Sequence, residues 1–293
     1  MTGLFARRED CTFHARPHPT GEPSSLYTIA LAGGQPQKIE PIGCPDEVRS
    51  FTRPDWSWHR DSFEVAFSGA SSIYLLDMRT SRCRRVLKGS SNDNKIYSYP
   101  SWYPDGRSLS ITNYWIRVNQ NGCSSEPNPK QVLLRLNVRN RSKVPLTSAQ
   151  RIWPGMSSVA QDPKTGFPLI AFAGEPPKMN LPYCQNDNQI WIRLPRGQLR
   201  QVDGGQGRAP WWSPSGKLIA FESNRCTRGN YQIFIQDPYQ PEKIVAVTPP
   251  DSNVQHAKWS PDGRKLVFAY QAGDDGQGIA YIDLGSSDPF GLQ

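Results

Sequence analysis

The chain has 293 residues, with 34 Lys and Arg against 26 Asp and Glu, so its formal net charge is +8. This excess of base allows an anionic partner without requiring one, because the cations are scattered apart from short clusters such as Arg82, Arg84 and Arg85. No apolar run is long enough to span a membrane, and residues 1–10 lack the apolar stretch of a secretory signal. The chain is therefore expected to be intracellular, or exported with its signal absent from this sequence.

A short motif recurs along the chain: a leading residue, usually Trp, followed by a tight turn and a hydrophobic strand. The leading residues are Trp58, Trp102, Val159, Trp212 and Trp259. The clearest copy reads Trp-Ser-Pro-Asp-Gly-Arg-Lys-Leu-Val-Phe-Ala over residues 259–269. A loose repeat of this length, built from strands and tight turns, is typical of a β-propeller.

Each repeat is interpreted as four strands, A to D, joined by a turn, a loop and a second turn. In the copy over 208–252, strand A ends at Trp212, and residues 213–216 form the first turn, because Pro fixes φ early in a turn and Gly tolerates positive φ late in it. Strand B covers 217–221, strand C 231–235 and strand D 243–247. The leading Trp is expected to pack between neighbouring blades, since large aromatic side chains fill wedge-shaped gaps.

Six segments have the alternation expected of strand C, at 26–31, 73–77, 132–136, 189–193, 231–235 and 279–283. The sequence therefore predicts an all-β fold, a six-bladed β-propeller of four-stranded antiparallel blades forming a single domain over 1–293. The predicted blades cover 1–46, 47–95, 96–150, 151–207, 208–252 and 253–293. Five or seven blades are the alternatives, because neither end of the chain supplies an obvious closing strand.

The Trp-Ser-Pro-Asp-Gly motif at 259–263 resembles the propeller repeat of the TolB family, which also occurs in the propellers of prolyl-oligopeptidase-type peptidases. The resemblance covers residue 50 to the C-terminus. It implies a six-bladed, usually exported protein that works by binding other molecules. TolB has a separate N-terminal domain for which this chain has no room, and the Gly-x-Ser-x-Gly pentapeptide of the peptidases is missing here.

The predicted B-to-C loops are long and are expected to lie on one face, where binding sites are usual. Five of them cover residues 7–25, 113–130, 174–188, 222–230 and 270–278. Cys11, Cys123, Cys184 and Cys226 fall in these loops and are expected to form disulfides with one another, whereas Cys44 and Cys83 either pair or stay free. Six free thiols are the alternative. No close cysteine spacing indicates zinc, and neither a metal nor a cofactor is expected.

A second candidate site is the mouth of the central channel, lined by residues that stand a few positions before each turn. They are Arg53, Asp55, Tyr97, Tyr99, Arg151, Trp153, Arg208, His256 and Lys258. Base outnumbers acid in this set, and arginines near aromatic side chains suit carboxylate, phosphate or sulfate groups.

These features favour a non-enzymatic propeller that binds a protein partner on the long-loop face, as a scaffold or as a subunit of a larger assembly. The alternative is a propeller that binds or acts on a small anionic ligand or an acidic glycan at the channel mouth. Catalysis is less favoured, because no fixed spacing joins His256, Asp55 and Glu47. Nucleic acid is disfavoured too, since Trp115 and Trp191 lie in segments interpreted as buried strands. A periplasmic or secreted location is expected, with the cytoplasm as the alternative.

Overall fold

A computed structural model describes most of the chain as β-strands and turns. The described residues are 10–15, 25–30, 34–45, 51–57, 59, 62–90, 93, 95–114, 123–127, 131–176, 182–184, 188–225, 230–271, 277–285 and 290. The chain divides into two compact units, one made of Met1–Trp115 and Gln131–Leu146, the other of Ile116–Lys130 and Thr147–Gln293. Among the described residues, no helix is long and apolar enough to cross a membrane.

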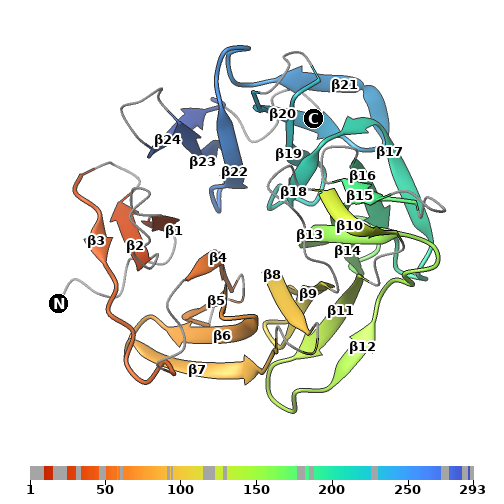
Figure 1. Cartoon of the computed structure of the whole chain (residues 1–293). Helices are drawn as coiled ribbons and strands as arrows, with labels where there is room; N and C mark the ends of the chain where they lie inside the picture. The colour runs from red at the N-terminus through yellow and green to blue at the C-terminus, as the bar shows by residue number, and fades with distance from the viewer. Residues whose placement is uncertain are drawn as a thin grey trace. The chain divides into compact units, whose positions relative to one another are not determined.

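The described residues of the first unit form three antiparallel sheets (Figure 1). Their strands, in order across each sheet, are β1 (Asp10–Ala15), β2 (Ser25–Ala30) and β3 (Gln37–Lys38); β4 (Thr52–Trp56), β5 (Glu64–Gly69), β6 (Ser72–Asp77) and β7 (Arg82–Leu87); and β8 (Ile96–Trp102), β9 (Ser108–Tyr114), β11 (Val132–Asn137) and β12 (Lys143–Pro145).

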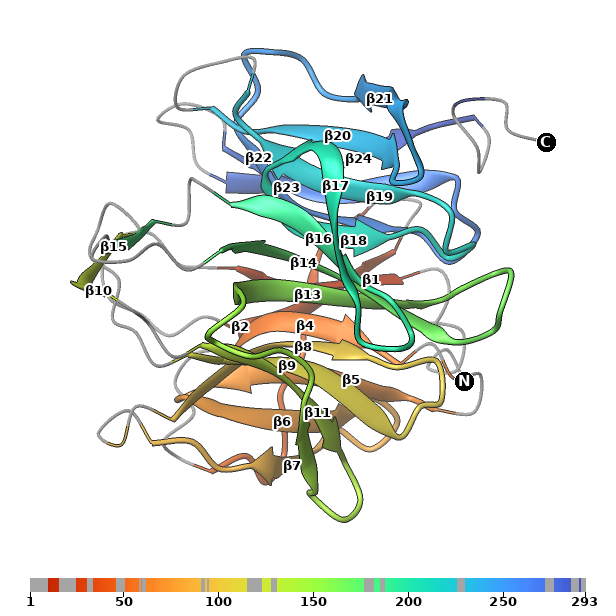
Figure 2. The same ribbon diagram turned by 90° about the vertical axis from the view of Figure 1, so that its right-hand side faces the viewer.

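In its described part, the second unit forms three further sheets of this kind and one short strand pair. Their strands are β13 (Trp153–Gln161), β14 (Pro168–Glu175), β16 (Gln189–Arg193) and β17 (Leu199–Gln206); β18 (Arg208–Trp212), β19 (Ile219–Ser223), β20 (Gln232–Asp237) and β21 (Gln240–Ala246); and β22 (Val254–Trp259), β23 (Lys265–Gln271) and β24 (Gln277–Asp283). The short pair joins β10 (Cys123–Pro127) to β15 (Pro182–Cys184), and Figure 2 shows it beyond the ends of β14 and β16.

The predicted all-β propeller of four-stranded antiparallel blades is confirmed, but the structure has five blades rather than six. The six predicted C strands coincide with β2, β6, β11, β16, β20 and β24. The difference in blade number comes from the ends of the chain, where neither sheet has four strands. The N-terminal sheet departs furthest from a blade, because β3 has only two residues, both exposed.

The turns after the leading residues have the predicted conformation. Gly106, Gly216 and Gly263 have φ values of 60°, 69° and 72°, and each donates its N–H to the carbonyl three residues earlier. Asp105 stabilises its turn further, because one of its carboxylate oxygens accepts hydrogen bonds from the N–H groups of Arg107 and Ser108 at 2.8 and 3.0 Å. The Gly residues of the motif, with Asp105 in its own copy, therefore form the tight turn between the first two strands of these three sheets, as predicted from the sequence.

The leading tryptophans join neighbouring sheets within each unit, as predicted. Trp102 is fully buried, and its indole Nε1 donates to the Asp55 carbonyl on β4 at 3.1 Å. In the second unit, Trp259 makes the equivalent bond to the Trp211 carbonyl, also at 3.1 Å. The prediction of Trp58 as a leading residue is wrong by two positions. The leading residue is Trp56, which pairs with Val65 on the second strand as Trp102 pairs with Leu109. Trp58 itself lies outside the described residues.

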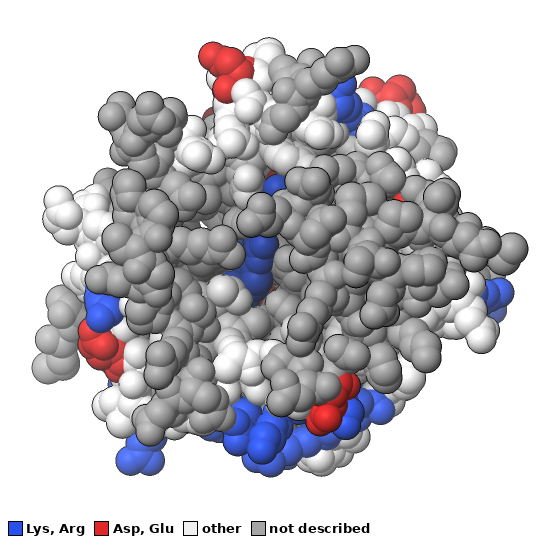
Figure 3. Space-filling view, viewed as in Figure 1, with Lys and Arg blue, Asp and Glu red and all other residues white. Residues whose placement is uncertain are grey.

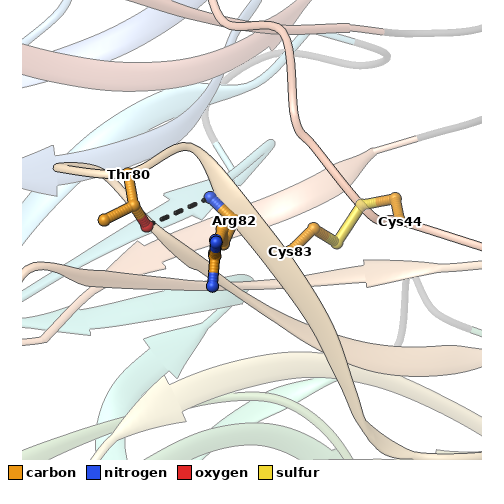
Figure 4. Close-up of a disulfide and its surroundings, with 4 residues drawn as sticks. All are labelled: Cys44, Thr80, Arg82 and Cys83. Carbon is orange, nitrogen blue, oxygen red and sulfur yellow. Dashed lines mark hydrogen bonds between the residues drawn. A yellow bond between two sulfur atoms is a disulfide. The ribbon is translucent and has the colours of Figure 1, made fainter.

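Cys44 and Cys83 form a disulfide (Figure 4). Of the two predicted outcomes, that these cysteines pair or that they stay free, the structure has the first. The segment before Cys44 runs beside β7, with Ile42 in a parallel bridge to Arg82. The backbone of Ile42 donates to the Ser81 carbonyl at 2.7 Å and accepts from the Cys83 N–H at 2.8 Å. The outer edge of β7 is therefore partly occupied by another part of the same chain, which limits edge-to-edge association.

Replacing both cysteines, Cys44→Ala with Cys83→Ala, is expected to lower the free energy of unfolding by about 2–4 kcal/mol. The disulfide closes a loop with a sequence separation of 39 residues, and its loss increases the entropy of the unfolded chain. Urea denaturation of the double variant measures the effect. An unchanged midpoint in the variant, with the wild-type protein confirmed as oxidised, would contradict this expectation.

Candidate functional site

The first strands of five sheets share a β-bulge. The pairing register shifts between residues 52 and 55, 98 and 101, 155 and 158, 208 and 211, and 255 and 258. Each bulge contains one non-glycine residue with positive φ: Arg53, Tyr99, Met156, Ala209 and His256, with φ values between 49° and 61°. In contrast, β1 pairs with β2 in continuous register from Asp10 to Ala15. The bulge therefore distinguishes these five sheets from the N-terminal one.

Each bulge lies near the start of the first strand, opposite the end of the second strand, from which the B-to-C loop leaves. In the sheet that contains β18, for example, Arg208 pairs with Glu222, near the beginning of the predicted loop 222–230. Positive φ is unfavourable for residues with a side chain and costs roughly 1–3 kcal/mol at each position. Such strain concentrates where a protein binds ligands, so the five bulges indicate this edge of the sheets as the functional one.

The substitution Ala209→Gly is expected to stabilise the protein by up to about 1 kcal/mol, because glycine adopts positive φ without steric cost. Ala246→Gly in the outer strand of the same sheet is the matched control, since Ala246 does not have positive φ. The control is expected to lower stability by about 0.5–1 kcal/mol. Thermal unfolding compares the two variants, and a loss of stability in both would show that the bulge is not strained at Ala209.

Glu222 is the centre of a charged cluster in the second unit. Its side chain is fully buried, and the Arg208 Nε donates to one carboxylate oxygen at 2.8 Å. His256, on the adjacent first strand β22, uses the other oxygen: its backbone N–H donates at 2.5 Å and its Nδ1 lies 3.1 Å away. One buried carboxylate therefore binds the bulged segments of two neighbouring sheets together.

Two cation–aromatic contacts involve the same first strands, β18 and β22. The guanidinium of Arg208 lies over the ring of Tyr231, 3.9 Å from its centroid, and the Lys258 ammonium lies 4.0 Å from the ring centroid of Trp211. All four side chains are partly exposed. Burial raises the pKa of Tyr231 despite the opposing charge of Arg208, so its hydroxyl stays protonated at neutral pH. We call Arg208, Tyr231, Glu222, His256, Lys258 and Trp211 the Glu222 cluster.

The stability that Glu222 provides is expected to depend on pH. Burial acts to raise the pKa of Glu222, but the charge and hydrogen bond of His256 and the charge of Arg208 outweigh it and lower the pKa from 4.5 to about 2. Because the pKa is lower in the folded state, this contribution is complete above pH 4.5 and is lost as the pH falls toward about 2. As the pH falls through this window, the free energy of unfolding of Glu222→Gln is expected to decrease less than that of the wild type. Identical acid transitions would contradict the assignment.

The predicted mouth residues of the first unit form a smaller group. The Arg53 guanidinium lies 4.7 Å from the ring centroid of Tyr99, and its Nη2 donates to the Tyr99 hydroxyl at 3.3 Å. Tyr97 is buried, and its hydroxyl accepts a hydrogen bond from Lys143 Nζ at 3.3 Å. Asp55 is also buried and accepts the Trp102 backbone N–H at 2.8 Å. Asp55 therefore holds two sheets together, while Arg53 and Tyr99 remain candidates for contact with a partner.

Two other predicted mouth residues belong to the start of β13 and the turn before it. Arg151 is exposed in a turn, where its backbone N–H donates to the Ser148 carbonyl at 2.9 Å. Trp153 is buried, with its indole Nε1 donating to the Ala149 carbonyl at 3.0 Å. Trp153 is thus a packing residue. Of the nine predicted residues, Arg208 and His256 are brought together on Glu222, and Lys258 lies two residues after His256 on the same strand, against the Trp211 ring.

The loop cysteines are only partly described. Cys123 and Cys184 are directly opposite each other in the register of β10 and β15, and Cys11 is in β1. Cys226 lies outside the described residues. Pairing among these four cysteines stays a prediction, which non-reducing peptide mapping tests. In the described part of the chain, no group of three His, Cys, Asp or Glu side chains is arranged to hold a metal ion.

Sequence reasoning missed Glu222 and its aromatic neighbours Trp211 and Tyr231. It placed Glu222 at the start of a loop, whereas β19 continues to Ser223. A signal was present, because Glu222 follows the apolar run Leu-Ile-Ala-Phe at 218–221 without a break. A carboxylate that continues a buried strand requires a cationic partner, although the sequence does not say which cation supplies it.

Comparison with known proteins identifies the fold. No protein-family model matches the chain, and no curated protein matches it in sequence. Among solved structures, TolB from Acinetobacter baumannii is similar with a TM-score of 0.65 and 20% identity, over 95% of this chain and 62% of that one. The nidogen/laminin complex gives a TM-score of 0.63 with 10% identity, over 95% and 91% of the two chains. A manganese-bound oligogalacturonate lyase gives 0.58 with 14% identity, over 94% and 72%.

These similarities establish a TolB-like propeller fold. The identities are too low to transfer an activity, and the chain spans less than two thirds of the length of the TolB structure. The structurally similar proteins also differ in kind, since they include a lyase and a component of a protein complex. Function must therefore be argued from the residues of this chain.

Proposed function

We propose that this propeller is a non-enzymatic binding module that recognises a protein partner at the sheet edge carrying the bulges and the B-to-C loops. In this proposal residues 1–293 act as one domain, as a scaffold or as a subunit of a larger assembly. The observation that carries the proposal is the Glu222 cluster, where one buried carboxylate holds Arg208 and His256. Partly exposed Tyr231, Trp211 and Lys258 complete two cation–aromatic contacts beside this pair of bonds.

The residue types of the cluster support a protein partner. Trp, Tyr and Arg are the side chains most enriched among the residues that contribute most to protein–protein binding energy. Here the rings of Tyr231 and Trp211 are already packed against cations, so little side-chain freedom is lost on binding. The bulges fix the backbone around them. A rigid, partly apolar surface of this kind suits an interface better than a flexible polar one.

The alternative, a small anionic ligand or acidic glycan bound at the channel mouth, is less well supported. Arg208 and His256 both contact Glu222, and its carboxylate offsets one positive charge within the protein. An added anion would have to displace a fully buried carboxylate from its partners, which is costly. Lys258 supplies one further cation, and that charge alone does not define an anion site.

We further propose that the protein functions outside the cytoplasm, in the periplasm or as a secreted protein. The Cys44–Cys83 disulfide supports this location, because structural disulfides persist mainly in oxidising compartments. The structure of nidogen was solved in complex with laminin, which is a precedent for a propeller of similar fold in a protein complex. That precedent concerns nidogen, and the partner of the present chain has to be found by experiment.

The test is affinity capture from the native source under non-reducing conditions, followed by mass spectrometry of the bound proteins. We expect the wild type to retain one stoichiometric protein and the double variant Tyr231→Ala, Lys258→Ala to retain at least about tenfold less, which corresponds to about 1.4 kcal/mol. The control variant Tyr239→Ala, Lys217→Ala alters two exposed residues in turns of the same sheet. Equal capture by all three proteins, or no stoichiometric partner, would overturn the proposal.

A further inference from the structure

Three arginines from two sheets of the first unit meet around Val138, away from the bulges. Arg84, on the outer strand β7, directs its Nη1 to the Val138 carbonyl at 3.5 Å, and its Nη2 contacts Glu64 at 2.9 Å. The Val138 N–H donates to the carbonyl of Arg107 at 3.0 Å, and Arg139 is the next residue in the chain. These contacts bring three arginine positions that are distant in the sequence, 84, 107 and 139, into one region of the unit.

Two more arginines extend this surface along the rim. Arg82 is two residues before Arg84 on β7, so both side chains leave the same face of the strand about 7 Å apart. Arg141 is exposed in the turn between β11 and β12. Figure 3 shows Lys and Arg side chains gathered at the bottom of the view, where β7 and the β11–β12 hairpin lie in Figure 1. We call Arg82, Arg84, Arg107, Arg139 and Arg141 the arginine rim.

Most of this charge is not neutralised by the protein. Among the described residues, Arg82, Arg107, Arg139 and Arg141 are exposed and have no carboxylate partner, while Arg84 alone pairs with Glu64. Like charges held close together repel one another, and that repulsion is relieved when an anion binds between them. The arginine rim is thus poised to bind an external polyanion.

The disulfide fixes one side of the arginine rim. Cys83 lies between Arg82 and Arg84 and is bonded to Cys44, and Figure 4 shows the Arg82 side chain leaving the strand away from this bond. The edge of β7 near Arg82 is already paired with Ile42, so addition of a partner strand at that point is blocked. What β7 presents here is a row of guanidinium groups on a rigid support.

We propose that the arginine rim binds a linear acidic polysaccharide through its carboxylate or sulfate groups. The planar guanidinium groups of these arginines bind carboxylate and sulfate oxygens in pairs, with defined geometry. An acidic polysaccharide has anionic groups at repeating intervals along an extended chain, which fits charges spaced along a strand and continued on a neighbouring hairpin.

Nucleic acid and membrane are less well matched to the arginine rim. Single-stranded nucleic acid requires aromatic platforms for its bases, and the large exposed apolar side chains of the described part of this unit are Ile42 and Val144. An anionic membrane requires an apolar face that enters the lipid together with a basic one, and two separate aliphatic side chains do not form such a face. The Cys44–Cys83 disulfide also favours the extracellular chemistry of glycans.

The experiment measures binding of the oxidised, full-length protein to heparin, which is polysulfated, and to polygalacturonate, which carries carboxylates, at physiological salt. The test variant is Arg82→Gln, Arg107→Gln, Arg139→Gln. The control variant, Arg196→Gln, Lys217→Gln, Arg264→Gln, removes the same charge from exposed turns of the second unit. We expect the wild type to bind at least one glycan, the test variant to bind it at least about tenfold more weakly, and the control to change by less than about twofold.

Two results would overturn the proposal: no binding to either glycan, whether or not the protein binds vesicles of anionic phospholipid, or equal weakening in both variants. Equal weakening would mean that net charge alone accounts for the attraction. The proposal is independent of the Glu222 cluster, because the test variant leaves that cluster unchanged. The test variant is therefore expected to retain any protein partner captured by the wild type.

Discussion

Replacing Arg208 by leucine is expected to destabilise the protein by about 3–5 kcal/mol. Glu222 is fully buried, and the substitution removes one of its two cationic partners without giving the carboxylate access to water. Chemical denaturation measures the loss. The control is Arg264→Leu, which alters an exposed arginine and is expected to change stability by less than about 0.5 kcal/mol.

The double variant Arg208→Leu, Glu222→Leu separates charge burial from simple loss of packing. If an uncompensated charge is the cause, removing Glu222 as well restores much of the stability, since an apolar pair often replaces a buried ion pair at little cost. Strictly additive losses, or a loss below about 1 kcal/mol in Arg208→Leu, would contradict this account of the Glu222 cluster.

Trp102→Ala is expected to destabilise the protein by about 3–5 kcal/mol. Trp102 is fully buried in a core that also contains Ile73 and Leu75 of the neighbouring sheet, so the substitution leaves a cavity. The variant also loses the indole hydrogen bond to the Asp55 carbonyl, which joins β8 to β4. Thermal and chemical unfolding both measure the change.

Trp102→Phe separates the two contributions of this residue. It keeps most of the apolar volume but removes the indole N–H, leaves the buried Asp55 carbonyl without that donor, and is expected to cost about 1–3 kcal/mol. Tyr239→Ala, at a half-exposed ring outside this core, is the control and is expected to have a small effect. A loss in Trp102→Ala no larger than that of the control would mean that the repeat does not join the sheets as described.

The strands and turns of this protein were predictable because their signals are local. Pro and Gly at fixed positions specify the turn around 213–216, and alternation of apolar residues specifies strands such as β16 and β20. The two-residue error at Trp58 has an equally local cause. Residues 56–58 read Trp-Ser-Trp, and two tryptophans two positions apart point to the same face of a strand, so spacing alone does not separate them.

The bulges were not predictable from residue type. Positive φ normally indicates Gly or Asn, yet the five bulge positions carry Arg, Tyr, Met, Ala and His. Their conformation is imposed by the surrounding sheets and not by their own preferences. The blade number was overestimated for a related reason: strand C recurs six times, but the number of complete sheets depends on pairing between distant segments, which local patterns do not report.

The candidate site was predictable in part. Counting back from the turns identified Arg208, His256 and Lys258, because the first strand of each blade begins at the same distance from its turn. It could not show that Arg208 and His256 share Glu222, since this contact joins β18 and β22 through a residue of β19. The arginines at 82, 84 and 85 were recognised as a cluster in the sequence, whereas their contact with the hairpin at Val138 appears only in the folded unit.

Photo-crosslinking tests the central claim, that the edge bearing the Glu222 cluster binds a protein partner. A photoreactive phenylalanine derivative replaces Tyr231 in one variant and Tyr239, on a turn outside the cluster, in another. Irradiation in the native source is predicted to give one discrete protein adduct from position 231 and none from position 239. An adduct from position 239 alone, or none from either variant, would contradict the account.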